Sequence, residues 1–269
     1  MAGGAVGGRR NARSRTIGPV AVDRLVELVE RRQPCVALTG AGISTESGIP
    51  DFRSADGIWA EYDPIEVATI DAFLADPVKV WDFYRLRLDV AGAAEPNDGH
   101  RALAELEQRN WVRGVITQNV DGLHARAGSR ALVEVHGSLR AAVCIHCGAR
   151  VPMDEAAPLL PAPPCPECGE ILKPDVVMFG ELLPEAAISR ARQLAAEAKL
   201  LLVVGSSLEV HPVAALPQAT LDAGGALAIV NRGGTPWDDR AILVVDAGAG
   251  ETLRALAERL PVGLRHGGE

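Results

Sequence analysis

Hydrophobic residues along the chain follow two patterns that alternate. Residues 21–29 repeat their apolar positions at helical spacing, and the chain then turns through Gln33-Pro34 into a short unbroken apolar run at 35–39. Such a run is typical of a buried strand. Comparable runs occur at 115–117, 132–135, 200–204, 227–230 and 242–245, mostly with helical stretches before or between them. Strands separated by helices predict an α/β fold, a parallel sheet with helices on both faces.

Two segments interrupt this alternation. Residues 52–98 hold a helical excursion, including a helix that Asp76 can cap and Pro77 can open at its first position. Residues 140–175 hold two Cys-x-x-Cys pairs and a proline-rich stretch, without a core-sized apolar pattern. Both are interpreted as insertions that together form a smaller lobe, made of a helical module (52–98) and a zinc ribbon (140–175).

The rest of the chain is expected to form the larger domain. We expect a discontinuous, Rossmann-like nucleotide-binding domain of residues 18–51, 99–139 and 176–260. Residues 1–17 are expected to be a disordered basic tail, because four arginines stand there among small residues with no apolar segment behind them. A basic arm for an acidic partner is the alternative. Residues 261–269 are expected to be a flexible tail.

Composition and charge narrow the function classes. With 269 residues and 48% hydrophobic composition the chain can bury a sizeable core. Its formal charge of -8 argues against a nucleic-acid groove, which needs a net cationic face. No apolar run approaches the about 18 residues of a membrane helix, and we find no export signal. We therefore expect a cytoplasmic monomer without membrane contact or a specific nucleic-acid partner.

The cysteines predict a metal site. Cys144-x2-Cys147 and Cys165-x2-Cys168 are separated by 17 residues, a spacing typical of a zinc-binding double knuckle. Four thiolates close a tetrahedral Zn²⁺ shell and leave no position for water, so we expect one structural ion. Cys35 lies inside the first apolar run and is interpreted as a core residue, not a nucleophile. His146, between two of the cysteines, is expected to be a solvated bystander.

Polar residues gather after the predicted strands. Gly40-Ala41-Gly42 follows the first strand, where glycines can let backbone N–H groups approach a pyrophosphate. That signal is weak alone, because the third glycine of a dinucleotide fingerprint is not at its usual offset, and on the glycine pattern by itself a plain tight turn is the better explanation. Asn119 and Asp121 follow a second strand, and His136 follows a third. Each could be a turn or surface residue, but together at strand ends they predict a ligand site.

Several motifs occur together and in order: the glycine loop, residues 117–124, His136, the four cysteines and Gly205-Ser206-Ser207. In this combination the chain resembles the sirtuin family, NAD-dependent protein lysine deacylases, from about residue 20 to 260. The resemblance implies an acyltransferase with NAD as cosubstrate and acyl-lysine proteins or peptides as substrates. The acyl oxygen would attack the anomeric carbon of the nicotinamide ribose and give an alkylimidate. Free lysine, nicotinamide and O-acyl-ADP-ribose would be the products.

The resemblance also implies roles for individual residues. His136 would be the general base on a ribose hydroxyl, with Asn119 at the nicotinamide ribose, and an imidazole suits this role because its unperturbed pKa is about 6.5. Val177 and Phe179 would belong to a segment that binds the substrate backbone by strand addition. The implied cofactor-binding residues are Gly40, Ala41, Gly42, Ile49, Asp51, Phe52, Arg53, Gln118, Asn119, Asp121, Gly205, Ser206, Ser207, Asn231, Arg232, Asp246 and Ala247.

One further motif bears on the acyl group. Tyr84 and Arg87 are three residues apart in a predicted helix and therefore share one face. Sirtuins that remove succinyl, malonyl or glutaryl groups carry a Tyr-x-x-Arg of this kind, and an exposed pair on a solvated helix face is the alternative. His211 stands where the family often has tyrosine, and residues 208–239 resemble deacetylase-type bacterial members. Activity on both acetyl-lysine and acidic acyl-lysines is therefore expected.

Two other functions stay open. One is an ADP-ribosyltransferase or NAD glycohydrolase at the same site, in which a protein side chain or water replaces the acyl oxygen as nucleophile. The other is a non-catalytic zinc-ribbon module that senses NAD and docks on nucleic acid. The acidic net charge and the presence of His136 argue against the second of these.

Overall fold

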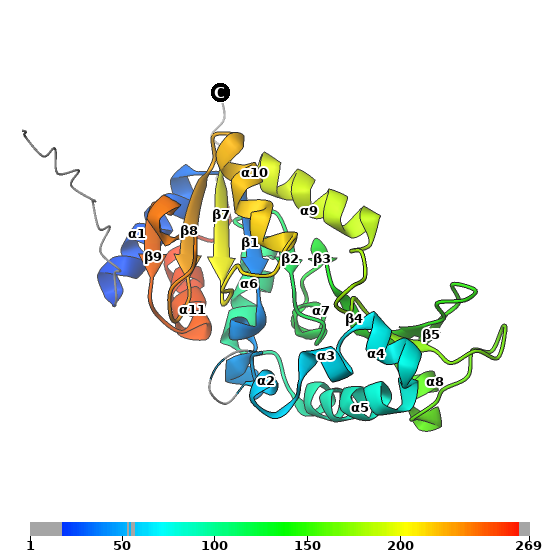
Figure 1. Cartoon of the computed structure of the whole chain (residues 1–269). Helices are drawn as coiled ribbons and strands as arrows, with labels where there is room; N and C mark the ends of the chain where they lie inside the picture. The colour runs from blue at the N-terminus through cyan, green and yellow to red at the C-terminus, as the bar shows by residue number, and fades with distance from the viewer. Residues whose placement is uncertain (1–17, 53, 55–56, 264–269) are drawn as a thin grey trace, which may run out of the picture.

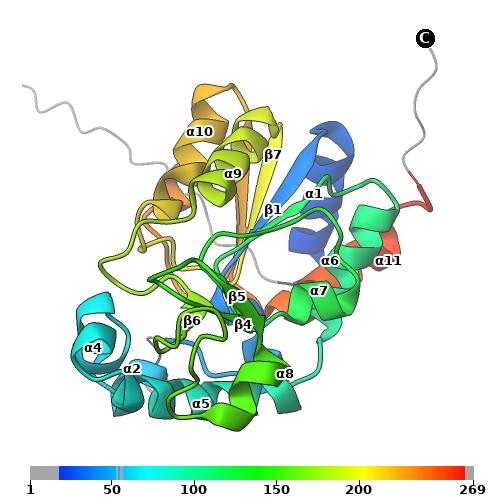
Figure 2. The same ribbon diagram turned by 90° about the vertical axis from the view of Figure 1, so that its right-hand side faces the viewer.

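The computed structural model describes residues 18–52, 54 and 57–263 (Figures 1 and 2). The disordered tail expected at 1–17, the role expected for Arg53 and the end of the flexible tail expected at 261–269 concern residues outside this description. None of the described helices is both long and apolar enough to cross a membrane.

A six-stranded sheet forms the centre of the larger part of the molecule. Its strands lie in the order β3-β2-β1-β7-β8-β9, and every neighbouring pair is parallel. Each lies within one residue of the run predicted for it, which confirms the α/β fold. The strands are β1 (Cys35–Thr39), β2 (Val115–Thr117), β3 (Leu132–Glu134), β7 (Leu200–Val204), β8 (Ala226–Val230) and β9 (Leu243–Val245).

Helices cover both faces of this sheet (Figure 1). On one face lie α1 (Pro19–Arg31), α6 (Asp98–Gln108) and α11 (Ala249–Arg259), and on the other lie α9 (Glu185–Glu197) and α10 (Leu216–Asp222). In β1, Cys35 and Ala37 enter the first core, whereas Val36 and Leu38 enter the second. Burial raises the pKa of the Cys35 thiol to about 12, as expected of a core residue.

The smaller lobe combines two segments that are far apart in the sequence (Figure 2). Trp81 is fully buried between them, and its Nε1 donates to Leu172 O at 2.7 Å. Asp76 caps the longest of its helices by accepting a hydrogen bond from Lys79 N at 3.0 Å, as predicted. The helices are α2 (Ile58–Glu61), α3 (Pro64–Val67), α4 (Ile70–Ala75), α5 (Pro77–Ala93) and α8 (Met153–Ala156), and the antiparallel strands are β4 (Gly137–Val143), β5 (Arg150–Pro152) and β6 (Lys173–Val176).

The strand order reverses between β1 and β7. From β1 the chain continues outward to β2 and β3, whereas β7 begins the opposite half that continues to β8 and β9. Open parallel sheets bind ligands at the carboxyl ends of strands at such a reversal, because the two loops diverge there and leave a crevice. The remaining short elements are α7 (Leu123–Ala127) and the 3₁₀ turns Ala41–Ile43, Thr45–Ser47, Ala157–Leu159, Val213–Ala215 and Asp238–Arg240.

Candidate active site

A cleft of about 820 Å³ opens at the carboxyl ends of β1 and β7 and extends to the smaller lobe. Of the described residues expected to bind NAD or substrate or to act in catalysis, all but Asp246 line it. The Asp246 carboxylate instead accepts a hydrogen bond from Gly233 N at 3.4 Å. The lining residues are Gly40, Ala41, Gly42, Ile49, Asp51, Phe52, Tyr84, Arg87, Gln118, Asn119, Asp121, His136, Val177, Phe179, Gly205, Ser206, Ser207, Asn231, Arg232 and Ala247.

The glycine loop packs directly against the loop after β7. Gly42 N donates to Gly205 O at 2.8 Å, and a Cβ at Gly42 would lie 2.9 Å from Gly205 Cα. Gly205 has a φ of 59°, and a Cβ there would collide with Ile43 N. The N–H of Gly42 is thus used within the protein, and the approach of this loop to a pyrophosphate stays a prediction. The glycines let the two loops meet and form the floor of the cleft.

A buried polar network holds Asn119 and Asp121. Asn119 Nδ2 donates to Gly40 O at 3.2 Å and to Ser44 Oγ at 3.0 Å, and Ser44 Oγ donates to Asp121 at 2.7 Å. Asp121 also accepts a hydrogen bond from Leu123 N at 2.9 Å. Sequence reasoning missed Ser44, although its position directly after the glycines was a usable signal. The network holds the side chains of Asn119 and Asp121 at the cleft floor through hydrogen bonds within the protein.

His136 is held in one orientation at the cleft wall. Its Nδ1 lies 3.0 Å from Gln118 O, and because a carbonyl can only accept, Nδ1 carries the proton. In the neutral ring Nε2 is then unprotonated and can take up a proton. Burial lowers the pKa of His136, and the hydrogen bond to Gln118 opposes this shift. The imidazole is therefore a neutral base at pH 7.

Two more histidines lie behind the network and carry charge poorly. His100 and His124 are buried with ring centroids 4.8 Å apart. Burial lowers the pKa of His100 to about 4 and that of His124, which also faces His100, to about 3. Between pH 6.5 and about 4 the unfolded chain therefore binds more protons than the folded protein, and folding stability is lost as the pH falls through this window.

We expect this pair to set much of the acid sensitivity of the fold. Each buried histidine should lower the free energy of unfolding by about 1.4 kcal/mol per pH unit between pH 6 and 4.5. A His124→Gln variant, whose amide can still bond Thr39, should show a shallower slope by about that amount. Urea unfolding at several pH values measures both slopes. Equal slopes in the two proteins would mean that His124 takes up a proton in the folded protein as readily as in the unfolded chain.

Tyr84 and Arg87 face the cleft from α5. Tyr84 is 6% exposed, so the alternative of an exposed pair on a solvated face is wrong. Burial raises the pKa of Tyr84 to about 12, with a smaller opposing effect of Arg87, so the phenol remains a hydrogen-bond donor. The Arg87 Cζ lies 5.0 Å from the ring centre of Phe52 and 5.7 Å from that of Phe83. No carboxylate of the described residues forms an ion pair with Arg87.

Aromatic rings form the wall around these two side chains. Trp59 lies 5.3 Å from Phe52, 6.2 Å from Phe83 and 6.5 Å from Phe179, measured between ring centroids. Sequence reasoning missed Trp59 and Phe83, because they come from the short α2 and the long α5, whose approach depends on tertiary packing. The rings lower the local polarity and strengthen any contact that the Arg87 guanidinium makes with an anion.

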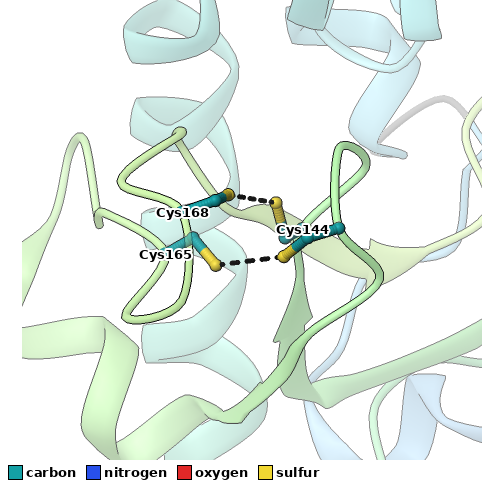
Figure 3. Close-up of side chains that lie close together, drawn as sticks. Cys144, Cys165 and Cys168 are labelled. Atoms are coloured by element: carbon teal, nitrogen blue, oxygen red, sulfur yellow. Dashed lines mark hydrogen bonds between the residues drawn. The ribbon is translucent and has the colours of Figure 1, made fainter.

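The four cysteines of the zinc ribbon come together in the smaller lobe. Their sulfur atoms all lie within 4.8 Å of one another, with Cys144 Sγ 3.5 Å from Cys168 Sγ and Cys147 Sγ 3.6 Å from Cys165 Sγ. Four sulfurs at the ~2.3 Å zinc–sulfur distance are about 3.8 Å apart in a tetrahedron. Figure 3 shows the side chains directed at one another from two turns. The residues therefore fit one Zn²⁺, and His146 is exposed beside them, as expected.

The chain is similar to known proteins over most of its length. The model of the Sir2 family matches residues 40–212. An NAD-dependent protein deacylase 2 of Pyrobaculum aerophilum is 45% identical over 241 residues, which is 90% of this chain and 96% of that protein. An NAD-dependent protein deacylase of Thermus thermophilus is 48% identical over 237 residues, 87% of this chain and 92% of that protein.

Solved structures give the same result. A crystal structure of a Sir2 homolog–NAD complex superposes with a TM-score of 0.83 at 42% identity, covering 88% of this chain and 92% of that one. A Sir2–p53 peptide–NAD⁺ structure superposes with a TM-score of 0.81 at 38% identity, covering 88% of this chain and 97% of that one. The residues matched by the family model include the glycine loop, His136 and the four cysteines. This chain belongs to the Sir2 family.

Proposed function

We propose that this protein is an NAD-dependent protein lysine deacylase that transfers the acyl group from lysine to ADP-ribose and releases nicotinamide. The observation that carries the proposal is the oriented, neutral imidazole of His136 on the wall of a cleft at the strand reversal. Relatives that share most of the chain's length are NAD-dependent protein deacylases, and one similar structure holds NAD.

The cleft divides into parts with different tasks. Small and polar residues after β7 and β8, including Ser206, Ser207 and Asn231, are suited to hold the phosphates and the adenosine end of the dinucleotide. Asn119 and Ile49 lie toward the nicotinamide side. When bound, NAD would supply an electrophilic anomeric carbon and nicotinamide as the leaving group. The protein's part is to orient the two substrates and to exclude water from their contact.

His136 is proposed to take the proton of a ribose hydroxyl through Nε2. The proton on Nδ1 stays on the ring, because Gln118 O accepts a hydrogen bond from it. Over the whole reaction NAD⁺, acyl-lysine and water give nicotinamide, lysine and O-acyl-ADP-ribose. Asn119 would hold the nicotinamide ribose, and the polar network beneath it would keep the amide in place.

The substrate is proposed to be an extended acyl-lysine peptide. Val177 and Phe179 line the cleft beside His136, and the Phe179 side chain is 48% exposed. Extended peptides bind such segments by adding a strand, so that backbone hydrogen bonds give affinity for many sequences. A similar Sir2 structure holds a p53 peptide together with NAD⁺.

Product analysis tests the proposal. The protein is incubated with NAD and an acetyl-lysine peptide, and the nucleotide products are identified by mass. We expect O-acetyl-ADP-ribose and nicotinamide in equal amounts, both dependent on the peptide. ADP-ribose alone would indicate an NAD glycohydrolase, ADP-ribose joined to protein would indicate an ADP-ribosyltransferase, and unconsumed NAD would favour the non-catalytic module.

The acyl specificity is proposed to include succinyl and malonyl groups. Arg87 offers a guanidinium that forms no ion pair with the described residues, and Tyr84 offers a protonated phenol, at the aromatic end of the cleft. A carboxylate at the end of the acyl chain could accept hydrogen bonds from both. We retain acetyl-lysine as a substrate because residues 208–239 resemble those of bacterial deacetylases, and the bacterial subtype itself stays a prediction.

Substitution of Arg87 separates these substrates. Arg87→Met keeps an unbranched apolar stem but removes the guanidinium and its charge. The loss of a charge-assisted contact costs roughly 1.5 to 3 kcal/mol, so desuccinylation should fall about tenfold to a hundredfold while deacetylation stays within about threefold. The measurement is kcat/KM on two peptides that differ only in the acyl group. Arg85→Met, on the exposed side of the same helix, is the matched control. Equal losses on both peptides would show that Arg87 does not read the acyl group.

Two further proposals concern the location of the protein and its division into domains. We propose a cytoplasmic monomer without a specific nucleic-acid partner, because thiolates that bind zinc stay reduced in that compartment. We further propose the division into a nucleotide-binding domain of residues 18–51, 99–139 and 176–260 and a smaller lobe of residues 52–98 and 140–175.

A further inference from the structure

A buried ammonium lies beneath the part of the cleft wall formed by residues 176–181, here called the peptide segment. Lys173, at the start of β6, is 3% exposed. Its Nζ donates to three acceptors, Pro174 O at 3.1 Å, Val176 O at 2.6 Å and Glu181 Oε2 at 3.0 Å. The same carboxylate oxygen of Glu181 accepts a hydrogen bond from Met178 N at 2.8 Å. One cation therefore ties the beginning of the peptide segment to its end.

The peptide segment has further attachments besides Lys173. Phe179 exchanges backbone hydrogen bonds with Ala68 and Ile70, at 2.9 Å and 3.0 Å. Leu182, just beyond the segment, is 94% exposed, and Phe179 is half-exposed. Val176 and Met178 are buried in the core of the smaller lobe, whereas the half-exposed Phe179 lines the cleft. The hydrogen bonds that Lys173 and Glu181 make to Val176 and Met178 add to this packing and hold the backbone of the segment from the inside.

The peptide segment is also joined to the catalytic histidine. Val177 N donates to His136 O at 2.8 Å. Gly137, the next residue, has a φ of 77°, and a Cβ there would collide with Asp175 O. The turn at His136 and the start of the peptide segment therefore pack backbone to backbone. A shift of Val176 would move the edge that binds the peptide relative to the imidazole.

Stability alone does not explain why the ammonium of Lys173 is buried. Burying an ammonium is costly unless all its hydrogen bonds are made, and apolar side chains of similar size often stabilise a fold as well or better. Arg150 and Asp175 form an ion pair on the same small sheet with the Arg150 side chain 64% exposed. Every acceptor of Lys173, in contrast, lies between residues 174 and 181. Its effect is therefore concentrated on the peptide segment.

We propose that Lys173 is a positioning residue for substrate binding: its ammonium, together with Glu181, holds the peptide segment in the extended shape that accepts an acyl-lysine peptide beside His136. The proposal rests on the deacylase function proposed above. It predicts that loss of the ammonium weakens peptide binding and leaves NAD binding nearly unchanged, because no NAD-side loop contacts Lys173 among the described residues.

The test measures peptide binding and kinetics in one set of variants. Because Lys173→Met alone would leave a partly buried carboxylate unpaired, the main variant is Lys173→Met with Glu181→Gln, which removes both charges. We expect the Kd of a fluorescent acetyl-lysine peptide, measured by anisotropy without NAD, to rise about tenfold. The KM for the peptide should rise equally, and the KM for NAD should stay within about twofold. Lys173→Arg should restore the peptide Kd to within about threefold, and Arg150→Met is the matched control.

The outcomes separate the possible explanations. A peptide Kd in the double variant within twofold of the unaltered protein would overturn the proposal, as would equal increases in the KM values for peptide and NAD. If the double variant does not fold, the Glu181→Gln variant alone tests the proposal. The proposal predicts a rise of about threefold in its peptide Kd, and an unchanged Kd would overturn it. An unaltered protein that binds the peptide but forms no O-acyl-ADP-ribose would contradict the deacylase function and leave the role of Lys173 measurable.

Discussion

His136→Tyr is expected to lower kcat for deacylation by about 10²- to 10⁴-fold. The phenol of tyrosine cannot act as a base near pH 7. It also cannot replace the hydrogen bond from His136 Nδ1 to Gln118 O, which orients the imidazole in the cleft. The KM for NAD should change much less, since most of the dinucleotide would lie on the loops after β1, β7 and β8. Steady-state kinetics with an acetyl-lysine peptide, read as nicotinamide release, measure both constants.

Two controls keep this result specific to the imidazole. His146→Ala removes an exposed histidine of the smaller lobe and should leave kcat unchanged. The unfolding temperature of His136→Tyr should lie near that of the unaltered protein, because the polar network of Asn119, Ser44 and Asp121 does not pass through His136. Full turnover in a folded His136→Tyr variant would remove this histidine from the mechanism.

Removal of zinc is expected to unfold the smaller lobe. Structural zinc in small domains contributes on the order of 10 kcal/mol to folding, and the lobe has one core shared by the cysteine module and the helices around Trp81. Cys165→Ser or strong chelation should therefore lower the unfolding temperature by about 10 °C or more and abolish activity. Calorimetry together with metal analysis measures stability and zinc content in the same sample.

The control for the zinc prediction is the cysteine outside the cluster. Cys35→Ala removes a thiol from the core of β1 and should keep one zinc per chain, with only a moderate loss of stability. A metal-free protein that unfolds at the temperature of the zinc-bound protein would show that the four cysteines have no structural metal to lose.

The sequence predicted the architecture because its signals are local. Each strand of the large sheet is a short apolar run, and the Cys-x-x-Cys pairs have a spacing that a single ion explains. The start of α5 was also predictable from the sequence, because Asp76 and Pro77 are typical residues of a helix N-terminus. The gathering of Asn119 and His136 at one edge followed from the rule that parallel strands end on the same side of a sheet.

What the sequence did not reveal depends on contacts between distant segments. Trp59 and Phe83 meet only because α2 and α5 pack together. Nothing in the sequence singled out Lys173, because its burial is decided by the path of the eight residues that follow it. The packing of Gly42 was not visible in the sequence, because Gly205, its contact, lies more than 160 residues away and comes close only in the folded sheet.

A crystal structure with carba-NAD and an acyl-lysine peptide tests the central claim most directly, since the carbocyclic analogue cannot lose its nicotinamide. We expect the dinucleotide to cross the ends of β1 and β7, the acyl oxygen to face the ring carbon that replaces C1′, and His136 Nε2 to lie within hydrogen-bond reach of a ribose-like hydroxyl. An analogue bound elsewhere, or bound with its nicotinamide end far from His136, would contradict the account.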